Sequence, residues 1–202
     1  MAKVAVFLLF LLLCMFFISG MAKPASSKRE YIKALCKETP SPPLCVQYLS
    51  MFPNSTIQNP MKMANAALLA SLYRAQYAKS YTLTVIKRRK LVKHPIVDDC
   101  LDQISSAVQE LNDSITELHY LGGHAKKGSD DHQCDDDCHI SNIATWLSAA
   151  ETDSSTCVDE LDEWLSRNKS NLLTLFRTRF RNVVDAIGNA LALFCTFAAK
   201  CQ

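Results

Sequence analysis

The residues best suited to chemistry gather in one short stretch, "HAKKGSDDHQCDDDCH", which runs from His124 to His139. Thiolates and imidazoles are typical zinc ligands, and runs of carboxylates can hold calcium. The aspartates lack the glycine and the bidentate glutamate of a calcium loop, and an oxidising compartment favours a disulfide over zinc thiolates. We therefore expect a solvated acidic segment without a metal or a cofactor. Its cysteines and aspartates are Cys134, Cys138, Asp130, Asp131, Asp135, Asp136 and Asp137.

Nucleophilic catalysis requires a serine or cysteine activated by a neighbouring base that is itself oriented by a third group. All five histidines of the chain fall between His94 and His139, and none stands beside a plausible nucleophile. No serine, histidine and aspartate arrangement is evident from the spacing. The sequence thus predicts a protein that is not an enzyme.

The compartment is indicated by residues 1–22. A basic start at Lys3 is followed by a 15-residue apolar run from Val4 to Ile18 and by the small-residue segment "SGMA". This layout predicts a secretory signal peptide cleaved after Ala22. The alternative, a membrane anchor, would need about 20 apolar residues. Since no later segment approaches that length, we expect a secreted, extracellular protein that makes no membrane contact after cleavage.

The remaining chain, 23–202, suits a single domain with one core. Loss of Lys3 leaves 21 basic against 20 acidic residues, a net charge of +1, which disfavours nucleic acid as a partner. Three sequons, at Asn54, Asn112 and Asn168, are candidates for glycosylation on the secretory route.

Helical periodicity dominates the chain, and no run alternates as a strand would. The prolines all lie at or before Pro95, and four long segments carry apolar residues spaced alternately three and four. This pattern predicts an all-α, antiparallel up-down four-helix bundle over about 59–200. The predicted inward stripes are Ala66, Ala70, Tyr73, Tyr77, Tyr81 and Thr84; Val97, Leu101, Ile104, Val108, Leu111, Ile115 and Leu118; Ile140, Ile143, Leu147, Ala150, Ser154, Cys157, Leu161 and Trp164; and Leu172, Phe176, Phe180, Val183, Ile187, Ala190, Phe194 and Ala198.

A separate N-terminal unit is indicated by "CKETPSPPLC", because its prolines cannot continue a helix between Cys36 and Cys45. A bond between these cysteines would hold a small helical hairpin over about 28–58. A bond between Cys100 and Cys157 would tie two bundle helices across a 58-residue loop, worth about 4 kcal/mol in the chain-entropy model.

The other four cysteines are less determined by the sequence. Cys134 and Cys138, four residues apart, either close a small local loop or stay apart. Cys195 reads as a buried core thiol. Cys201 lies six positions later, which in a continuous helix is too far from Cys195 for a bond.

From about Tyr31 to Phe194 the chain resembles the plant invertase and pectin methylesterase inhibitor family. The resemblance rests on "YIKALCKETPSPPLC", "MANAALLASLYRAQYAKS", "DDCLDQISSAVQELNDSI", "NIATWLSAAETDSSTC" and "VVDAIGNALALF". It implies a helical hairpin followed by a four-helix bundle, with disulfides Cys36 to Cys45 and Cys100 to Cys157. It also implies a noncatalytic inhibitor that acts in the cell wall, the apoplast.

Within this family the target enzyme is the open question. The Pro-Lys-Phe element associated with invertase inhibitors is absent, and the chain reads "LVKHPIVDDC" before the third of the family's cysteines. We therefore expect a free-standing inhibitor of pectin methylesterase that covers the enzyme's pectin-binding cleft in a reversible one-to-one complex. An inhibitor of acid invertase and, outside the family, a secreted signalling ligand are the alternatives.

Several polar residues are candidates for the contact surface. Exposed positions on the first two long helices are expected at Arg74, Gln76, Gln103 and Glu110. The basic run from Lys87 to Lys93 either complements a helix dipole or binds acidic pectin. The aspartates between Asp130 and Asp137 either form a solvated linker or mimic demethylated pectin and steer association.

Overall fold

The structure is a computed structural model that describes residues 24–89, 94–121 and 134–198. The predicted signal peptide, Asp130, Asp131 and Cys201 lie outside these residues, as does the end of the basic run, 90–93. Every regular element in the described ranges is a helix, which confirms the all-α prediction. None of the described helices is long and apolar enough to cross a membrane.

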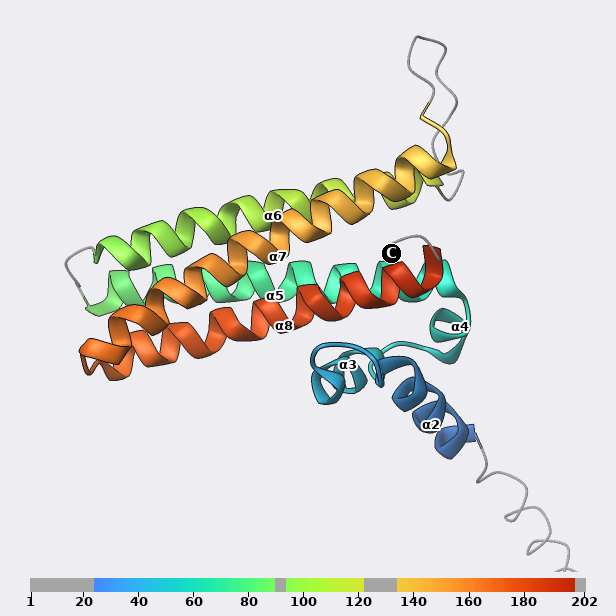
Figure 1. The fold of residues 1–202 in the computed structure, drawn as a ribbon. Coiled ribbons are helices and arrows are strands. Elements are labelled where there is room, and N and C mark those ends of the chain that lie inside the picture. The colour runs from blue at the N-terminus through green and yellow to red at the C-terminus, as the bar shows by residue number, and fades with distance from the viewer. Residues whose placement is uncertain (1–23, 90–93, 122–133, 199–202) are drawn as a thin grey trace, which may run out of the picture.

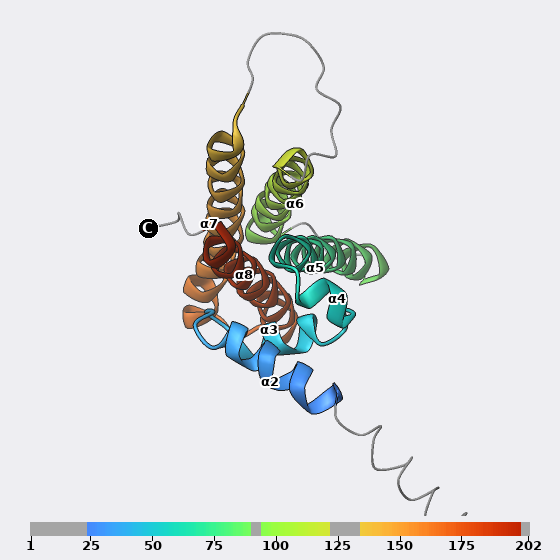
Figure 2. The same ribbon diagram turned by 90° about the vertical axis from the view of Figure 1, so that its right-hand side faces the viewer.

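Four long helices form the body of the protein: α5 (Pro60–Arg89), α6 (Pro95–Leu121), α7 (Asp136–Arg167) and α8 (Asn171–Ala198). Each packs against the next, and α5 packs against α8, which closes the set into an antiparallel bundle (Figure 1). The end-on view in Figure 2 shows the same arrangement, with the three short helices along one side. The predicted up-down four-helix bundle is thereby confirmed.

The starts of the helices follow ordinary capping chemistry. The Asn59 Oδ1 atom accepts a hydrogen bond of 2.9 Å from the Lys62 backbone N–H, with Pro60 as the first helical residue. Helix α7 begins four residues before the predicted Ile140, because the Asp135 side chain accepts a hydrogen bond from the Cys138 N–H. The aspartates at 135–137 are thus the N-cap and the first turn of a helix, where negative charge is favourable, and not a linker.

The core is built from the predicted stripes of α6, α7 and α8. Their central residues are buried, and the remainder of these stripes, such as Val108, Ile115 and Trp164, are half-buried against the core. This confirms the period and phase of three helices. The buried members are Val97, Leu101, Ile104, Leu111, Leu118, Ile143, Leu147, Ala150, Ser154, Cys157, Leu161, Phe176, Phe180, Val183, Ile187, Ala190 and Phe194.

The predicted stripe of α5 is only partly right: Ala66 is buried and Tyr81 is half-buried against the core, but Tyr73, Tyr77 and Thr84 are exposed. Tyr73 and Tyr77, predicted inside, are 64% and 44% exposed. Mostly small residues are buried on α5 instead, and the Ser71 hydroxyl donates a 2.8 Å hydrogen bond to the Ala186 carbonyl oxygen of α8. Tyrosines at this seam would hold the two helices apart. The residues buried on α5 are Met63, Ala64, Ala66, Ala67, Leu68, Ser71, Ala75, Ala78 and Thr82.

The N-terminal unit consists of α2 (Pro24–Cys36), α3 (Pro42–Leu49) and the single turn α4 (Asn54–Ile57). A disulfide joins Cys36 to Cys45 across the proline-rich turn. Helix α3 packs on both α5 and α8, and α2 reaches α8. The helical hairpin expected from the prolines is therefore present and docked on the bundle.

Two further disulfides are formed within the described ranges. One joins Cys100 of α6 to Cys157 of α7 in the buried core, and the other joins Cys134 to Cys138 at the start of α7. Cys195 is half-buried and disulfide-bonded, so the expectation of a free core thiol is wrong. Because Cys201 lies outside the described residues, the expectation that it is too far from Cys195 for a bond stays a prediction.

Candidate functional site

The four candidate contact residues differ in exposure. Gln76 is exposed on α5, as predicted. Arg74 is half-buried, because its guanidinium lies 4.6 Å from the centre of the Tyr48 ring on α3. This cation–π contact ties the hairpin to the bundle. Arg74 thus helps to dock the hairpin and is not the freely exposed side chain that we expected.

The two candidates on α6 lie in the seam with α7 and are half-buried. The Gln103 amide donates a 3.5 Å hydrogen bond to the Glu160 carboxylate. The pKa of Glu110 is raised to about 7, chiefly by burial and in smaller part by the neighbouring carboxylates of Asp153 and Asp113. The exposed surface expected at these positions is therefore wrong, and Glu110 is a titrating group within the fold.

An exposed stripe on α5 was not predicted as surface. Leu69, Tyr73 and Tyr77 follow one another at intervals of four residues, and they are 44%, 64% and 44% exposed. The two tyrosine rings stack with centroids 6.3 Å apart. We call these three residues the tyrosine stripe. Because residues four apart share a helix face, they present one continuous aromatic and aliphatic surface to solvent.

An arginine from α8 borders the tyrosine stripe. The Arg179 guanidinium lies 3.6 Å from the ring centre of Tyr81 and 5.4 Å from that of Tyr77. Through these cation–π contacts, Arg179 of α8 fixes the orientation of both tyrosine rings on α5. Tyrosine and arginine are the residue types enriched at protein interfaces and among binding hot spots. The arrangement is thus suited to binding another protein.

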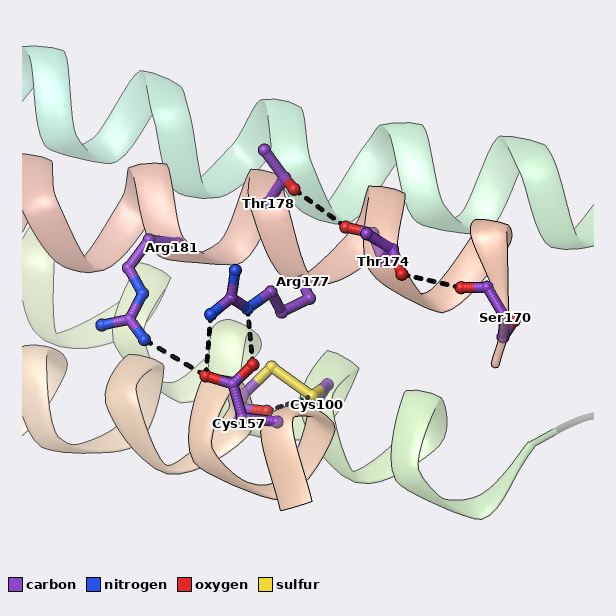
Figure 3. Close-up of polar contacts among 8 residues, drawn as sticks. Cys100, Cys157, Ser170, Thr174, Arg177, Thr178 and Arg181 are labelled. Atoms are coloured by element: carbon purple, nitrogen blue, oxygen red, sulfur yellow. Dashed lines mark hydrogen bonds and ion pairs between the residues drawn. A yellow bond between two sulfur atoms is a disulfide. The ribbon is translucent and has the colours of Figure 1, made fainter. Parts of the chain in front are cut away.

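A charged network joins α7 to α8 through two arginines that flank Arg179. Asp162 accepts hydrogen bonds of 2.6 and 3.0 Å from Arg177 and one of 3.3 Å from Arg181, and Figure 3 shows both arginine side chains. The hydrogen bonds from Arg177 hold the pKa of Asp162 below its usual range. This paired carboxylate holds two helices together and is ill-suited to acid or base catalysis.

The described histidines have structural neighbours. His94 meets the Trp164 ring edge-on at 5.2 Å, His119 is exposed, and His139 Nδ1 lies 2.5 Å from Glu117 Oε2. Within the described ranges no histidine is hydrogen-bonded to a serine, threonine or cysteine side chain. The arrangement that a catalytic triad requires is therefore missing from this part of the chain.

The predicted glycosylation sites and the basic run can be placed in part. Asn54 begins α4, Asn112 lies on α6 and Asn168 caps the end of α7, and all three side chains are exposed. Glycosylation at these sites stays a prediction. Lys87 and Arg88 are exposed in the last turns of α5, where cations suit the helix dipole.

Comparison with known proteins agrees with this architecture. The family model described as plant invertase/pectin methylesterase inhibitor matches residues 30–193. The chain is 35% identical over 181 residues to pectinesterase inhibitor 11 of Arabidopsis thaliana, covering 87% of this chain and 85% of the relative. It is 34% identical to pectinesterase inhibitor 9 of the same plant, covering 98% and 96%. The "21 kDa protein" of Daucus carota is 32% identical, covering 89% of each chain.

These matches span nearly the whole described fold, including both helical units and the cysteines that brace them. The family model and the names of the relatives that match over most of their length indicate a non-enzymatic inhibitor protein. The chain belongs to the plant invertase/pectin methylesterase inhibitor family.

Proposed function

We propose that this protein is a secreted inhibitor of pectin methylesterase, formed by one domain over 23–202, which acts in the apoplast. It binds the enzyme reversibly, one to one, and blocks the pectin-binding cleft. The similarity to pectinesterase inhibitors 9 and 11 supports the target, and the absence of the invertase-associated Pro-Lys-Phe element favours it over acid invertase. The tyrosine stripe is the observation that supports binding of the enzyme through this face of α5.

A rigid surface suits this function, because ordering flexible groups on binding costs free energy. The tyrosine stripe lies on a 30-residue helix packed on both sides by α6 and α8. Ring stacking and Arg179 hold Tyr77 in place before any partner arrives. A tyrosine also brings a large contact area with only two side-chain torsions to fix. An inhibitor of standard interface size would bury on the order of 1,600 Å² in total.

Titration of the purified, oxidised protein against two enzymes tests the target. We expect saturable inhibition of a plant pectin methylesterase with an end point at one inhibitor per enzyme, and no inhibition of an acid invertase. Because a cleft blocker competes with the polymer, the apparent affinity should fall as the pectin concentration rises. Inhibition of invertase alone would favour the alternative target, and inhibition of neither would refute the proposal.

A paired substitution tests the binding surface. Replacing both tyrosines of the stripe, Tyr73→Ala and Tyr77→Ala, should weaken the inhibition constant at least 30-fold, which corresponds to a hot spot of about 2 kcal/mol. Tyr31→Ala is the matched control, because Tyr31 is 46% exposed on α2, away from the stripe. Unchanged inhibition by the double variant would place the contact elsewhere while leaving the target itself intact.

A further inference from the structure

A cluster of metal-ligating side chains lies where α6 ends and α7 begins. Glu117 comes from α6, Cys134 precedes α7, and His139 lies in its first turns. One donor atom from each of these three half-buried residues lies within 4.8 Å of the other two. The sequence pointed to the cysteine and the histidine but not to Glu117, which is 17 residues before Cys134 on another helix.

The histidine and the carboxylate are already held in position. His139 Nδ1 and Glu117 Oε2 are 2.5 Å apart, and their side chains are only 16% and 21% exposed. The Tyr120 ring stacks on the imidazole with centroids 5.7 Å apart, which limits rotation of the ring. In metal sites, neighbouring side chains of this kind orient the residues that bind the metal directly. His139 Nδ1 and Glu117 Oε2 would therefore need to move apart by only a short distance for a metal ion to bind between them.

The sulfur of Cys138 lies close to the same cluster. The Asn142 Nδ2 atom lies 3.9 Å from the sulfur of Cys134 and 3.9 Å from that of Cys138. The same atom donates a 3.3 Å hydrogen bond to Glu117 Oε1. One amide thus touches both sulfurs and the carboxylate. The four groups comprise two sulfurs, one imidazole nitrogen and one carboxylate oxygen, a donor set that suits tetrahedral zinc.

The disulfide between Cys134 and Cys138 masks this site, because a disulfide sulfur lacks the thiolate charge that binds zinc. We propose that reduction of this disulfide creates a zinc site formed by Cys134, Cys138, His139 and Glu117. A dithiol supplies the two electrons and two protons that convert the disulfide to two thiols, and is itself oxidised to a disulfide. Zinc binding then releases both thiol protons, and the proton shared between His139 Nδ1 and Glu117 moves to Nε2 or is released, so that Nδ1 and the carboxylate are free to bind the ion.

Accessibility makes this disulfide a better target for a mild reductant than the two core disulfides. Cys134 and Cys138 are half-buried, whereas Cys36, Cys45, Cys100 and Cys157 are at most 2% exposed. Thiol–disulfide exchange requires a thiolate to reach a sulfur atom. The bundle and the hairpin therefore stay braced under conditions that open the new site.

The test uses the mature chain, treated with dithiothreitol and freed of it without oxygen. Cobalt(II) is titrated first, because cobalt–thiolate bonds give charge-transfer absorption, and zinc then displaces it. We expect one equivalent of cobalt to bind to the reduced protein and none to the oxidised protein. Glu117→Gln and His139→Gln should each weaken zinc binding at least tenfold, and Cys134→Ser with Cys138→Ser should abolish it.

The control is His119→Gln, because His119 is exposed on α6 two residues from Glu117 and outside the cluster. It should bind zinc as the unsubstituted chain does, and far-UV circular dichroism should show that every variant keeps its helices. Zinc binding that survives the double cysteine substitution, or that is indifferent to both Glu117→Gln and His139→Gln, would overturn the proposal. So would a reduced protein without the cobalt–thiolate absorption.

Discussion

At the scale of single residues, Asn189 is a buried side chain that joins the two helical units. Its Oδ1 atom accepts a 2.9 Å hydrogen bond from the Ser41 N–H, and its Nδ2 atom donates a 3.0 Å bond to the Ser41 carbonyl oxygen. The side chain is only 3% exposed. It thus satisfies both backbone groups of the turn that the prolines create, and a buried backbone group without a partner is costly.

We expect Asn189→Ala to lower the free energy of unfolding by about 2 kcal/mol, because two hydrogen bonds are lost and the Ser41 N–H is left without its partner. The Ser41 carbonyl oxygen keeps the hydrogen bond that it accepts from the Cys45 N–H. Urea denaturation followed by circular dichroism measures this change. Asn182→Ala on the same helix is the control and should change stability by less than about 0.5 kcal/mol, since Asn182 is half-buried and outside this contact. Equal effects of the two substitutions would contradict the role of Asn189.

The sequence contained Asn189 within "GNALALF" but could not reveal its partner, because Ser41 is 148 residues away and contributes only backbone atoms. The same limit hid Glu117, which acts together with residues of another helix. Local signals were more informative. The prolines of the turn and the spacing of apolar residues on α6, α7 and α8 depend on neighbours in the chain, and those features were predicted correctly.

At the scale of elements, α5 shows that a periodic pattern can predict a helix correctly and yet misassign residues of its buried face. The aromatic residues at four-residue spacing were predicted to form the core, yet the residues buried on α5 are mostly small, and Ser71 among them contacts α8. Small residues allow two helices to pack closely. A hydrophobicity scale ranks them low, because it measures the transfer of side chains from water and not the distance between helices. Tyr73 and Tyr77 consequently lie on the exposed face of α5, where we propose that they bind the partner enzyme.

Two neighbouring substitutions on α5 test which face is buried. Ala75 is fully buried and Gln76 is exposed. Ala75→Leu should lower the free energy of unfolding by about 1 to 3 kcal/mol, because the tight seam cannot accept the added carbons without displacement. Gln76→Leu should be nearly neutral, within about 0.5 kcal/mol. Thermal unfolding of both variants measures this difference, and the reverse order would contradict the burial of Ala75 in the seam.

At the scale of the whole molecule, buried carboxyl groups couple the fold to pH. Burial raises the pKa values of Glu151 and Asp185, as it does that of Glu110, and these three groups lie on α7, α8 and α6. A folded state with raised carboxyl pKa values binds protons more tightly than the unfolded chain. Its free energy of unfolding therefore falls as pH rises through the interval between the unfolded and folded pKa values.

Asp162 acts in the opposite direction. Its pKa lies below the ordinary value of 3.8 because Arg177 donates hydrogen bonds to its charged form. The stability it contributes is complete above that value and is lost as pH falls through its folded pKa. The opposite slopes of Asp162 and the raised carboxyl groups place the stability maximum in mildly acidic solution, above the range where Asp162 takes up its proton.

Glu110 dominates the slope on the neutral side, since its pKa moves from 4.5 to about 7. The melting temperature should fall as pH rises from about 4.5 to about 7, and Glu110→Gln should flatten this fall because a neutral amide has no proton to lose. At neutral pH the substitution should stabilise the fold, on the order of 1 kcal/mol, since solvent screens a half-buried group. Scanning calorimetry at several pH values measures both effects, with the exposed Glu38→Gln as control. A Glu110→Gln variant that keeps the full pH slope would show that other groups carry the coupling.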